Sequence, residues 1–292
     1  MDHPLITIFT PTYNRAILLP RLYASLKSQS IQNFEWVVVD DGSSDITEEV
    51  IKGFEAENRI PIQYIKKDNE GKHLAINKGV KLAQGDLFFI VDSDDYLTPN
   101  ATQLIANYYP KIKHRDDFAG MSFRRGISAT EYIGTNRTFD DIEATALDFR
   151  FKHRIDGDMA EVFKTSLLKL YPFPKIANEK FCSEGLVWNR IALKYKLLWT
   201  SNIIYIGEYL ADGLTDSSIR VRQQSPQYAI LGYSELSKMP IPFLQKVKAV
   251  VNYWRFAHFS ALPFRDKWRS VNPFLSLIAL PLSFIFRIKD PK

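Results

Sequence analysis

Short apolar runs alternate with amphipathic helical segments along residues 5–112, and this alternation leaves few folds open to the chain. The runs are rich in β-branched and aromatic residues, and the segments between them carry apolar residues at helical spacing. Strands are predicted at Leu5–Thr10, Glu35–Val39, Ile62–Ile65 and Leu87–Val91, and helices at Leu18–Gln29, Thr47–Phe54 and Lys72–Leu82. This order predicts an α/β fold with a mostly parallel, Rossmann-like sheet flanked by helices on both faces.

The pattern is looser after residue 112. Strands are predicted at Phe118–Phe123, Met159–Phe163 and Ile203–Ile206, a helix at Glu184–Leu193 with Ser183 as its N-cap, and helices from Ser225 onward. Pro11 is expected to end the first strand and Pro99 to open a helix. We therefore expect one domain at 1–220, built from halves 1–112 and 113–220, and a helical C-terminal region at 221–292.

Composition narrows the class of protein further. The chain has 292 residues, of which 46% are hydrophobic and 24% charged, and this is globular rather than disordered composition. Cys182 is the only cysteine, so a disulfide framework and a Cys-rich zinc module are excluded. The net charge of +5 suits an anionic partner such as a nucleotide or a phospholipid surface. No basic helix or RNP-like motif accompanies that charge, so we expect no nucleic-acid partner.

Polar clusters follow three of the predicted strands. The first cluster is PTYNR, which follows Thr10, the last residue of its strand. The second is DDGSSD, which begins at Asp40, and the third is DSDD, which begins at Asp92. In open α/β sheets, ligands bind beyond the carboxyl ends of the strands. One site built from three loops is therefore predicted.

The cluster Asp92-Ser93-Asp94-Asp95 carries the strongest chemical signal. Three carboxylates within four residues repel one another, and a hard cation such as Mg²⁺ or Mn²⁺ relieves that repulsion. The alternative is a solvated acidic turn, or an Asx-type helix start before Pro99.

The other two clusters suit a nucleotide. Acidic side chains at Asp40 and Asp41 can hold ribose hydroxyls or a base N–H, while Arg15 can reach a phosphate and Tyr13 can stack on a base. The alternatives are an ordinary capped turn and a polar loop without a ligand. A P-loop is rejected, because Gly71-Lys72 lacks the earlier glycine and the following Ser or Thr. The chain also has no G-x-G-x-x-G dinucleotide motif.

Four motifs in a fixed order resemble a known family. TPTYNR, VVVDDGSSD, NEGKHLAINKG and FIVDSDD, spread over Ile6–Asp95, resemble family 2 glycosyltransferases of the GT-A fold. The stretch Phe173–Thr215, with EKFCSEGLVWNRIA and EYLADGLT, looks like the acceptor side of bacterial enzymes that build capsular, exopolysaccharide or O-antigen units.

The resemblance implies an inverting, metal-dependent glycosyltransferase. It would move a sugar from a nucleotide-diphosphate donor, by default UDP-linked, to a glycan or a polyprenyl-diphosphate-linked glycan. The D-x-D of the family matches Asp92 and Asp94, which would bind Mn²⁺ or Mg²⁺. The residues implied to contact the nucleotide sugar are Thr10, Pro11, Tyr13, Arg15, Asp40, Asp41, Lys72, Asn77, Asp92 and Ser93.

An inverting transfer needs a base for the acceptor hydroxyl, and the family pattern points to Glu184. The alternative is that Glu184 only helps to begin its helix. Other candidate bases are Asp156, Asp158 and Glu179; Asp158 and Glu161 are also candidate acceptor contacts. Trp188 is a candidate for stacking on a sugar, or a core residue. Arg220 and Arg222 are candidates for closing over the diphosphate.

The C-terminal region carries its own signal. Pro273–Phe286 is apolar, too short to span a bilayer, and flanked by cations on both sides. These are Arg265, Lys267, Arg269, Arg287, Lys289 and Lys292. Such a segment suits an interfacial helix on an anionic membrane, kinked at Pro281, so residues 265–292 are expected to bind that surface. With no secretory signal at the N-terminus, we expect a cytoplasmic protein on the inner face of the cell membrane. The alternative is a core helix.

Two other functional hypotheses are weaker. A nucleotidyltransferase on a related sheet typically has a glycine-rich loop after its first strand, and TPTYNR has no glycine. A non-catalytic nucleotide- or sugar-binding module would need neither the intact DSDD nor Glu184.

Overall fold

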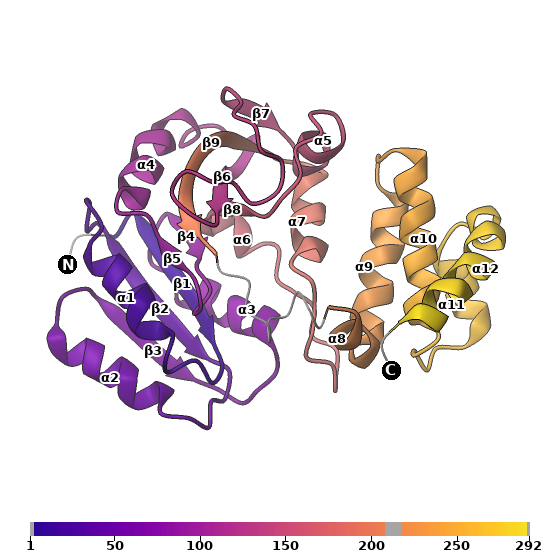
Figure 1. Cartoon of the computed structure of the whole chain (residues 1–292), viewed down its shortest axis with the longest axis horizontal. Helices are drawn as coiled ribbons and strands as arrows, with labels where there is room; N and C mark the ends of the chain where they lie inside the picture. The colour runs from indigo at the N-terminus through magenta and orange to yellow at the C-terminus, as the bar shows by residue number, and fades with distance from the viewer. Residues whose placement is uncertain (1–2, 208–217, 291–292) are drawn as a thin grey trace. The chain divides into compact units, whose positions relative to one another are not determined.

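The computed structural model describes residues 3–207 and 218–290, which group into two compact units (Figure 1). The first unit comprises residues 3–172 and 194–207, and the second comprises 173–193 and 218–290. This division differs from the predicted split at residue 220, because residues 173–193 group with the C-terminal helices. The predicted EYLADGLT motif at residues 208–215 and the cation Lys292 lie outside the described residues.

The first unit is built on one mixed sheet with the strand order β3-β2-β1-β4-β8-β6-β9-β5, and β7 pairs with β9. Its first four strands in that order are all parallel, as the α/β alternation predicts. β8 is antiparallel to β4 and β6, while β9 runs parallel to β6. The strands are β1 (Ile6–Thr12), β2 (Phe34–Asp40), β3 (Ile62–Lys66), β4 (Leu87–Ile90), β5 (Tyr96–Leu97), β6 (Phe118–Gly126), β7 (Ile142–Ala144), β8 (Met159–Lys164) and β9 (Lys196–Ile206).

Helices cover both faces of the sheet because successive strand residues, which point to opposite faces, are apolar. Ile8, Trp36 and Phe89 point to one face and pack in a single core with residues of the first, second and fourth helices. Phe9, one position along β1, points to the other face and meets the third helix at Gly79. The helices of this unit are α1 (Leu19–Lys27), α2 (Thr47–Glu57), α3 (Lys72–Leu82), α4 (Ala101–Tyr108), the 3-10 turn η1 (Tyr109–Lys111), α5 (Ala146–Phe151) and α6 (Thr165–Leu168).

Proline does not end β1, contrary to the sequence prediction. Pro11 and Thr12 continue the strand and pair with Val39 and Asp40 of β2. The pairing of β1 with β4 stops at Phe9, so the missing N–H of Pro11 costs no ladder hydrogen bond on that side. Pro99 also does not open a helix directly, because α4 begins only at Ala101.

β9 is much longer than predicted. The polar run Thr200-Ser201-Asn202 hides the strand in the sequence, because it interrupts two apolar stretches. In the structure the register with β6 shifts between Ser122 and Arg124, and the strand continues through this irregularity.

The second unit is helical, as predicted for the region after Ser225. Its helices are α7 (Gly185–Ala192), α8 (Ser218–Gln224), α9 (Pro226–Lys238), α10 (Phe243–Ala257), α11 (Phe264–Ser270) and α12 (Pro273–Lys289). Ser183 is not the N-cap of α7. That position is held by Glu184, in helical conformation and without a side-chain capping bond.

α12 docks on α10 through small residues. Ser276, Ala279 and Ser283 are buried, and Trp254 Nε1 donates a hydrogen bond of 2.9 Å to Ser276 Oγ. The helix runs through Pro281. No single helix of the described chain is long and apolar enough to cross a membrane; α11 and α12 meet that test only as a pair bent by 114°.

Candidate active site

The acidic cluster after β4 lies among cations. Asp92 Oδ1 is 2.6 Å from Lys72 Nζ, at the start of α3, and Asp92 Oδ2 is 3.9 Å from Arg125 Nη1, near the end of β6. Burial alone would raise the pKa of Asp92, but Lys72 and Arg125 outweigh it, and the pKa lies below its usual value. Asp92 is therefore a carboxylate held in its ionised form.

Asp94 and Asp95 have the opposite electrostatics. Burial, reinforced by the charge of Asp92, raises the pKa of Asp94, and the same two causes raise the pKa of Asp95 to about 6. Negative charge is thus concentrated beyond what the protein cations neutralise. Ser93, between Asp92 and Asp94, is almost fully buried.

Tyr205 of β9 ties the cluster together. The backbone N–H of Asp92 donates to Tyr205 Oη at 3.0 Å, and the Tyr205 hydroxyl donates to Asp95 Oδ2 at 2.6 Å. The Arg125 guanidinium lies over the Tyr205 ring, 4.0 Å from its centroid, and 3.9 Å from Asp95 Oδ2. Tyr205 and Arg125 therefore hold Asp95 in place. Asp92 and Asp94 are the two carboxylates of the predicted D-x-D.

Two residues of this cluster were missed in the sequence. The Arg124-Arg125 pair at the end of a predicted strand was a usable signal, since it places cations at the edge of the sheet. Tyr205 offered none, because it is more than a hundred residues from the aspartates that it contacts.

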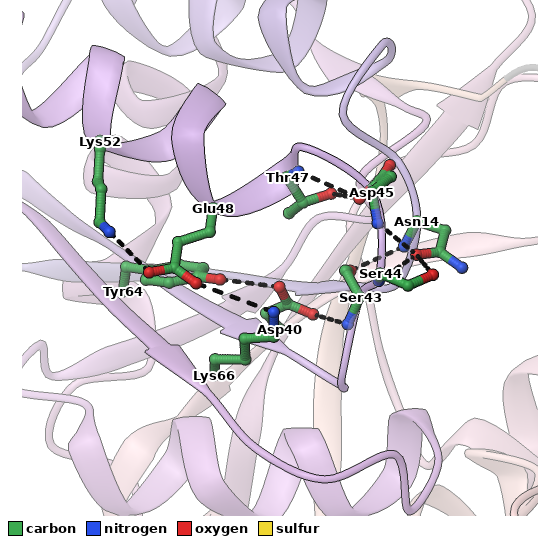
Figure 2. Close-up of polar contacts among 10 residues, drawn as sticks. All are labelled: Asn14, Asp40, Ser43, Ser44, Asp45, Thr47, Glu48, Lys52, Tyr64 and Lys66. Carbon is green, nitrogen blue, oxygen red and sulfur yellow. Dashed lines mark hydrogen bonds and ion pairs between the residues drawn. The ribbon is translucent and has the colours of Figure 1, made fainter.

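Asp40 is fully buried at the end of β2 (Figure 2). Its Oδ1 accepts the backbone N–H of Ser43 at 2.7 Å, and its Oδ2 accepts the Tyr64 hydroxyl at 2.8 Å. Gly42, with a φ of +87°, allows the turn to bring Ser43 back to Asp40. In this structure Asp40 shapes the loop and has no exposed surface to offer a base or ribose.

Asp41 organises the approach to α3. Its carboxylate accepts the backbone N–H groups of Glu70 (3.0 Å) and Gly71 (2.7 Å) and pairs with the Lys67 ammonium. Because Gly71 directly precedes Lys72, this carboxylate fixes the place where the lysine leaves the loop. Asn77 lies further along α3 and is partly exposed.

The loop after β1 is locked to the loop after β2 (Figure 2). Asn14 adopts a φ of +52°; its backbone N–H donates to Ser43 Oγ, and its amide oxygen accepts the backbone N–H of Ser44, both at 2.8 Å. Asp45 accepts the backbone N–H of Ala16 at 3.1 Å. These hydrogen bonds join the loops after β1 and β2 into one surface, which we call the ledge.

The predicted nucleotide contacts on this ledge differ in exposure. Thr10 is fully buried, and its hydroxyl accepts a 2.9 Å hydrogen bond from Trp36 Nε1, so its side chain faces the core. Pro11 is buried as well. Tyr13 is 48% exposed, and Arg15 is partly exposed and lowers the pKa of Asp94 against the effect of burial.

The acceptor-side candidates fall in both units. Glu184 lies in the second unit, partly exposed at the N-cap of α7. Asp156 and Asp158 are exposed, and Glu161 is partly exposed on β8 of the first unit. Glu184, Asp156 and Asp158 stay candidate bases, and Asp158 and Glu161 stay candidate acceptor contacts.

Three other predictions meet structural partners. Both oxygens of Glu179 are used to cap α9, because they accept the backbone N–H groups of Gln227 (2.8 Å) and Tyr228 (3.0 Å). Glu179 is thus a helix cap rather than a base. Trp188 packs edge-to-face with Phe173 at 5.8 Å, the core alternative. Arg220 is exposed, whereas Arg222 donates to the carbonyl of Ser218 at 2.6 Å.

Solved structures share this fold over nearly the whole chain. S. aureus TarS in complex with UDP-GlcNAc matches 97% of this chain and 88% of its own length, with a TM-score of 0.67 at 19% identity. A mannosyltransferase from Pyrobaculum calidifontis, in complex with GDP-Man and Mn²⁺, matches all of this chain and 89% of its own, with a TM-score of 0.59 at 15% identity. The mixed α/β architecture with a helical C-terminus is therefore that of GT-A glycosyltransferases.

Sequence relatives point the same way. A glucosyltransferase of Campylobacter jejuni, named for a GalNAc(5)-diNAcBac-PP-undecaprenol acceptor, is 26% identical over 81% of this chain and 74% of its own. Chondroitin synthase of Escherichia coli is 31% identical over 47% of this chain. The chain covers only part of these relatives' own length: the match spans 18% of that synthase and 43% of an uncharacterized glycosyltransferase of Haemophilus influenzae.

The family described as "Glycosyl transferase family 2" matches residues 7–169, more than half of the chain. The chain belongs to this family. The resemblance seen in the four N-terminal motifs is confirmed, and the family match does not support the nucleotidyltransferase hypothesis.

Proposed function

We propose that the chain is an inverting, metal-dependent glycosyltransferase of surface polysaccharide synthesis. It would transfer a hexosyl or hexosaminyl group from a UDP-linked donor to a glycan or lipid-linked glycan. The names of the relatives, which include a chondroitin synthase and a glucosyltransferase named for an undecaprenol-linked glycan, support this choice of substrates. The UDP-GlcNAc complex of a structural neighbour supports the donor class.

The observation that carries the proposal is the acidic cluster at the end of β4. Asp92 is held ionised by Lys72, and the raised pKa of Asp94 marks negative charge that a cation would offset. Within residues 3–207 and 218–290, no three His, Cys, Asp or Glu side chains gather as a metal site. Two carboxylates still fit Mg²⁺ or Mn²⁺, since such ions take one or two carboxylates and complete their shell with substrate phosphates.

Asp92 and Asp94 would hold that ion, which neutralises the charge of the leaving diphosphate when it is bound. Arg15 and Lys72 would add positive charge on the diphosphate side, and Tyr13 would pack on the base. Ser93 and Asn77 remain candidate donor contacts.

The acceptor hydroxyl would attack the anomeric carbon while Glu184 takes its proton. The new carbon–oxygen bond forms as the bond to the diphosphate breaks, and the electron pair leaves with the phosphate oxygen. This role for Glu184 rests on the family pattern around SEG, and Glu184→Gln is its test: transfer should be lost while donor binding remains.

The apolar part of α12 supports a peripheral membrane location on the cytoplasmic face. Phe274, Leu277 and Ile278 are 79%, 63% and 55% exposed, although the small-residue stripe of the same helix is buried. Basic residues stand before and after this apolar stretch in the sequence: Arg265 and Arg269 on α11, and Arg287 and Lys289 in the last turn of α12. An exposed apolar helix with flanking cations suits the headgroup region of an anionic membrane.

The decisive experiment is a screen of nucleotide-sugar hydrolysis with purified protein, Mn²⁺ or Mg²⁺ and no acceptor. Asp94→Asn is the test variant, and Asp116→Asn, which changes an exposed aspartate, is the matched control. We expect one donor to be consumed. EDTA and Asp94→Asn should each abolish this turnover, and Asp116→Asn should not change it. Turnover that survives both EDTA and Asp94→Asn would contradict the metal site. If no donor is consumed, calorimetry with UDP and Mn²⁺ follows, and the absence of nucleotide binding would overturn the proposal.

A further inference from the structure

A pocket of about 100 Å³ opens within the second unit, among α7, α8 and α9. A water-sized group needs about 10–15 Å³ of such space, so the pocket holds roughly seven to ten of them. A pyranose ring has six ring atoms, so this space takes the ring and part of its substituents, with the remainder at the open side. The pocket is therefore sized for a single small ring rather than for a chain of sugars.

The walls of the pocket combine polar and aromatic side chains. Ser183, Asn189 and Arg222 supply a hydroxyl, a carboxamide and a guanidinium, while Phe181 and Tyr233 supply rings. Two of these groups are held in place: Arg222 lies 5.4 Å from the centroid of Phe181, and Tyr233 stacks on Phe256 at 5.9 Å. Fixed groups bind a ligand without losing much conformational entropy.

This combination favours a sugar over other ligands. A pyranose offers C–H faces to aromatic rings and hydroxyls to groups that donate and accept hydrogen bonds. A lipid chain would bury the carboxamide of Asn189 and much of the Arg222 guanidinium against hydrocarbon, which is costly. Among the lining residues that the structure describes, Arg222 is the one charged side chain, and a single cation neutralises a diphosphate poorly.

Gly232 keeps the pocket open. It lies inside α9, where glycine is less favourable for the helix than alanine. A Cβ at this position would meet no atom within 4 Å, so no neighbouring side chain or backbone requires the glycine. Because Gly232 lines the pocket, any larger side chain would occupy the space of a ligand.

We propose that this pocket binds one sugar ring of the acceptor and that Gly232 sets the size of the ring it accepts. The inference rests on the proposed glycosyltransferase function and names where its acceptor is recognised. Ser183 and Gly185, on the pocket wall, are the two chain neighbours of the candidate base Glu184. A sugar bound here thus lies beside the segment that carries that base.

Saturation-transfer NMR tests the proposal without any turnover. The probes are the methyl glycosides of glucose, galactose, N-acetylglucosamine and N-acetylgalactosamine, each at millimolar concentration with the full chain. Gly232→Leu is the test variant. Gly53→Leu is the control, because Gly53 is also helical, has no atom within 4 Å of a Cβ and is exposed on α2 of the first unit. Both changes favour helix, so neither should unfold the protein.

We expect at least one glycoside to give a signal with the unchanged protein and with Gly53→Leu, and to lose it with Gly232→Leu and Asn189→Leu. A signal that persists in Gly232→Leu, no signal from any glycoside, or saturation of octanol in place of the glycosides would overturn the proposal. Asp94→Asn separates the proposed glycosyltransferase function from the proposed sugar pocket. It should abolish donor hydrolysis and leave the glycoside signal intact. Glycoside binding in a protein that binds no nucleotide would overturn the proposed function alone.

Discussion

The ammonium nitrogen of Lys72 lies 2.6 Å from Oδ1 of Asp92, so the first residue of α3 and the first carboxylate after β4 form one charged pair. Lys72 is placed by Gly71, whose backbone N–H donates to Asp41. The motif after β2 therefore positions the start of α3, and the start of α3 holds the motif after β4. Three sequence motifs act as one structure.

Replacing Lys72 by Met should lower the rate of donor hydrolysis by about 10²–10³-fold, the usual loss for one electrostatic group in an active site. The change removes the charge but keeps most of the volume. Lys78→Met, at an exposed position of the same helix, is the control and should be neutral. Equal kcat values for the two variants would show that the pair with Asp92 has no role in the reaction.

Asp41→Asn should destabilise the fold. The nearly buried carboxylate accepts two backbone N–H groups and pairs with Lys67, and hydrogen bonds to a charged group contribute about 1.5–3 kcal/mol each to stability. Because the amide keeps part of these contacts, we expect a loss of about 2–3 kcal/mol, seen in urea as a lower midpoint with an unchanged slope. Asp68→Asn, at an exposed site nearby, should shift the midpoint little. Equal midpoints would argue against the organising role of Asp41.

His73 should make stability depend on pH. The side chain is only 1% exposed, and burial lowers the pKa of His73 to about 4, against about 6.5 when unfolded. Between these values the unfolded chain binds a proton that the folded chain does not, so stability falls as the pH drops from about 6.5 to 4. The full loss is about 3 kcal/mol. His73→Gln should flatten urea midpoints across this window, and His114→Gln, at an exposed site, should not.

The exposed face of α12 should bind anionic vesicles. Flotation with phosphatidylglycerol vesicles should carry the protein upward, less so at high salt because salt screens the basic residues. The double change Leu277→Asp and Ile278→Asp should abolish flotation. Leu170→Asp, which alters a leucine 72% exposed in the first unit, should leave it unchanged. If the double variant floats as well as the unchanged protein, the apolar face of α12 does not bind the membrane and serves another partner.

Local patterns predicted most of the fold. The range Lys72–Leu82 was predicted with the bounds that α3 has, because its apolar spacing and flanking glycines mark both ends. β9 was found only in its last part, since the bulge against β6 depends on a strand that lies far away in the sequence. Pairing between distant segments leaves no signature in a short window.

The same limit applies to the candidate site. Asp92, Asp94 and Lys72 were identified from their motifs, and the structure brings Lys72 to Asp92. A motif gives the residue type at the end of a strand but not the direction of its side chain. Thr10 shares the alternation of Ile6 and Ile8, which point into the core, and this period-2 pattern was the available signal for its burial.

Tyr205 also determines when the acidic cluster can be completed during protein synthesis. Its hydroxyl joins Asp92 and Asp95 across 113 and 110 residues of chain. At a synthesis rate of about 5–20 residues per second, the ribosome delivers this tyrosine roughly 5–20 seconds after the aspartates. The four parallel strands β1–β4 have left the ribosome before then, whereas the hydrogen bonds of Asp92 and Asp95 to Tyr205 form only after β9 is made. During translation, the parallel part of the sheet therefore precedes the complete site. A chain that stops short of β9 can still pair Lys72 with Asp92, but it lacks the tyrosine that joins Asp92 to Asp95.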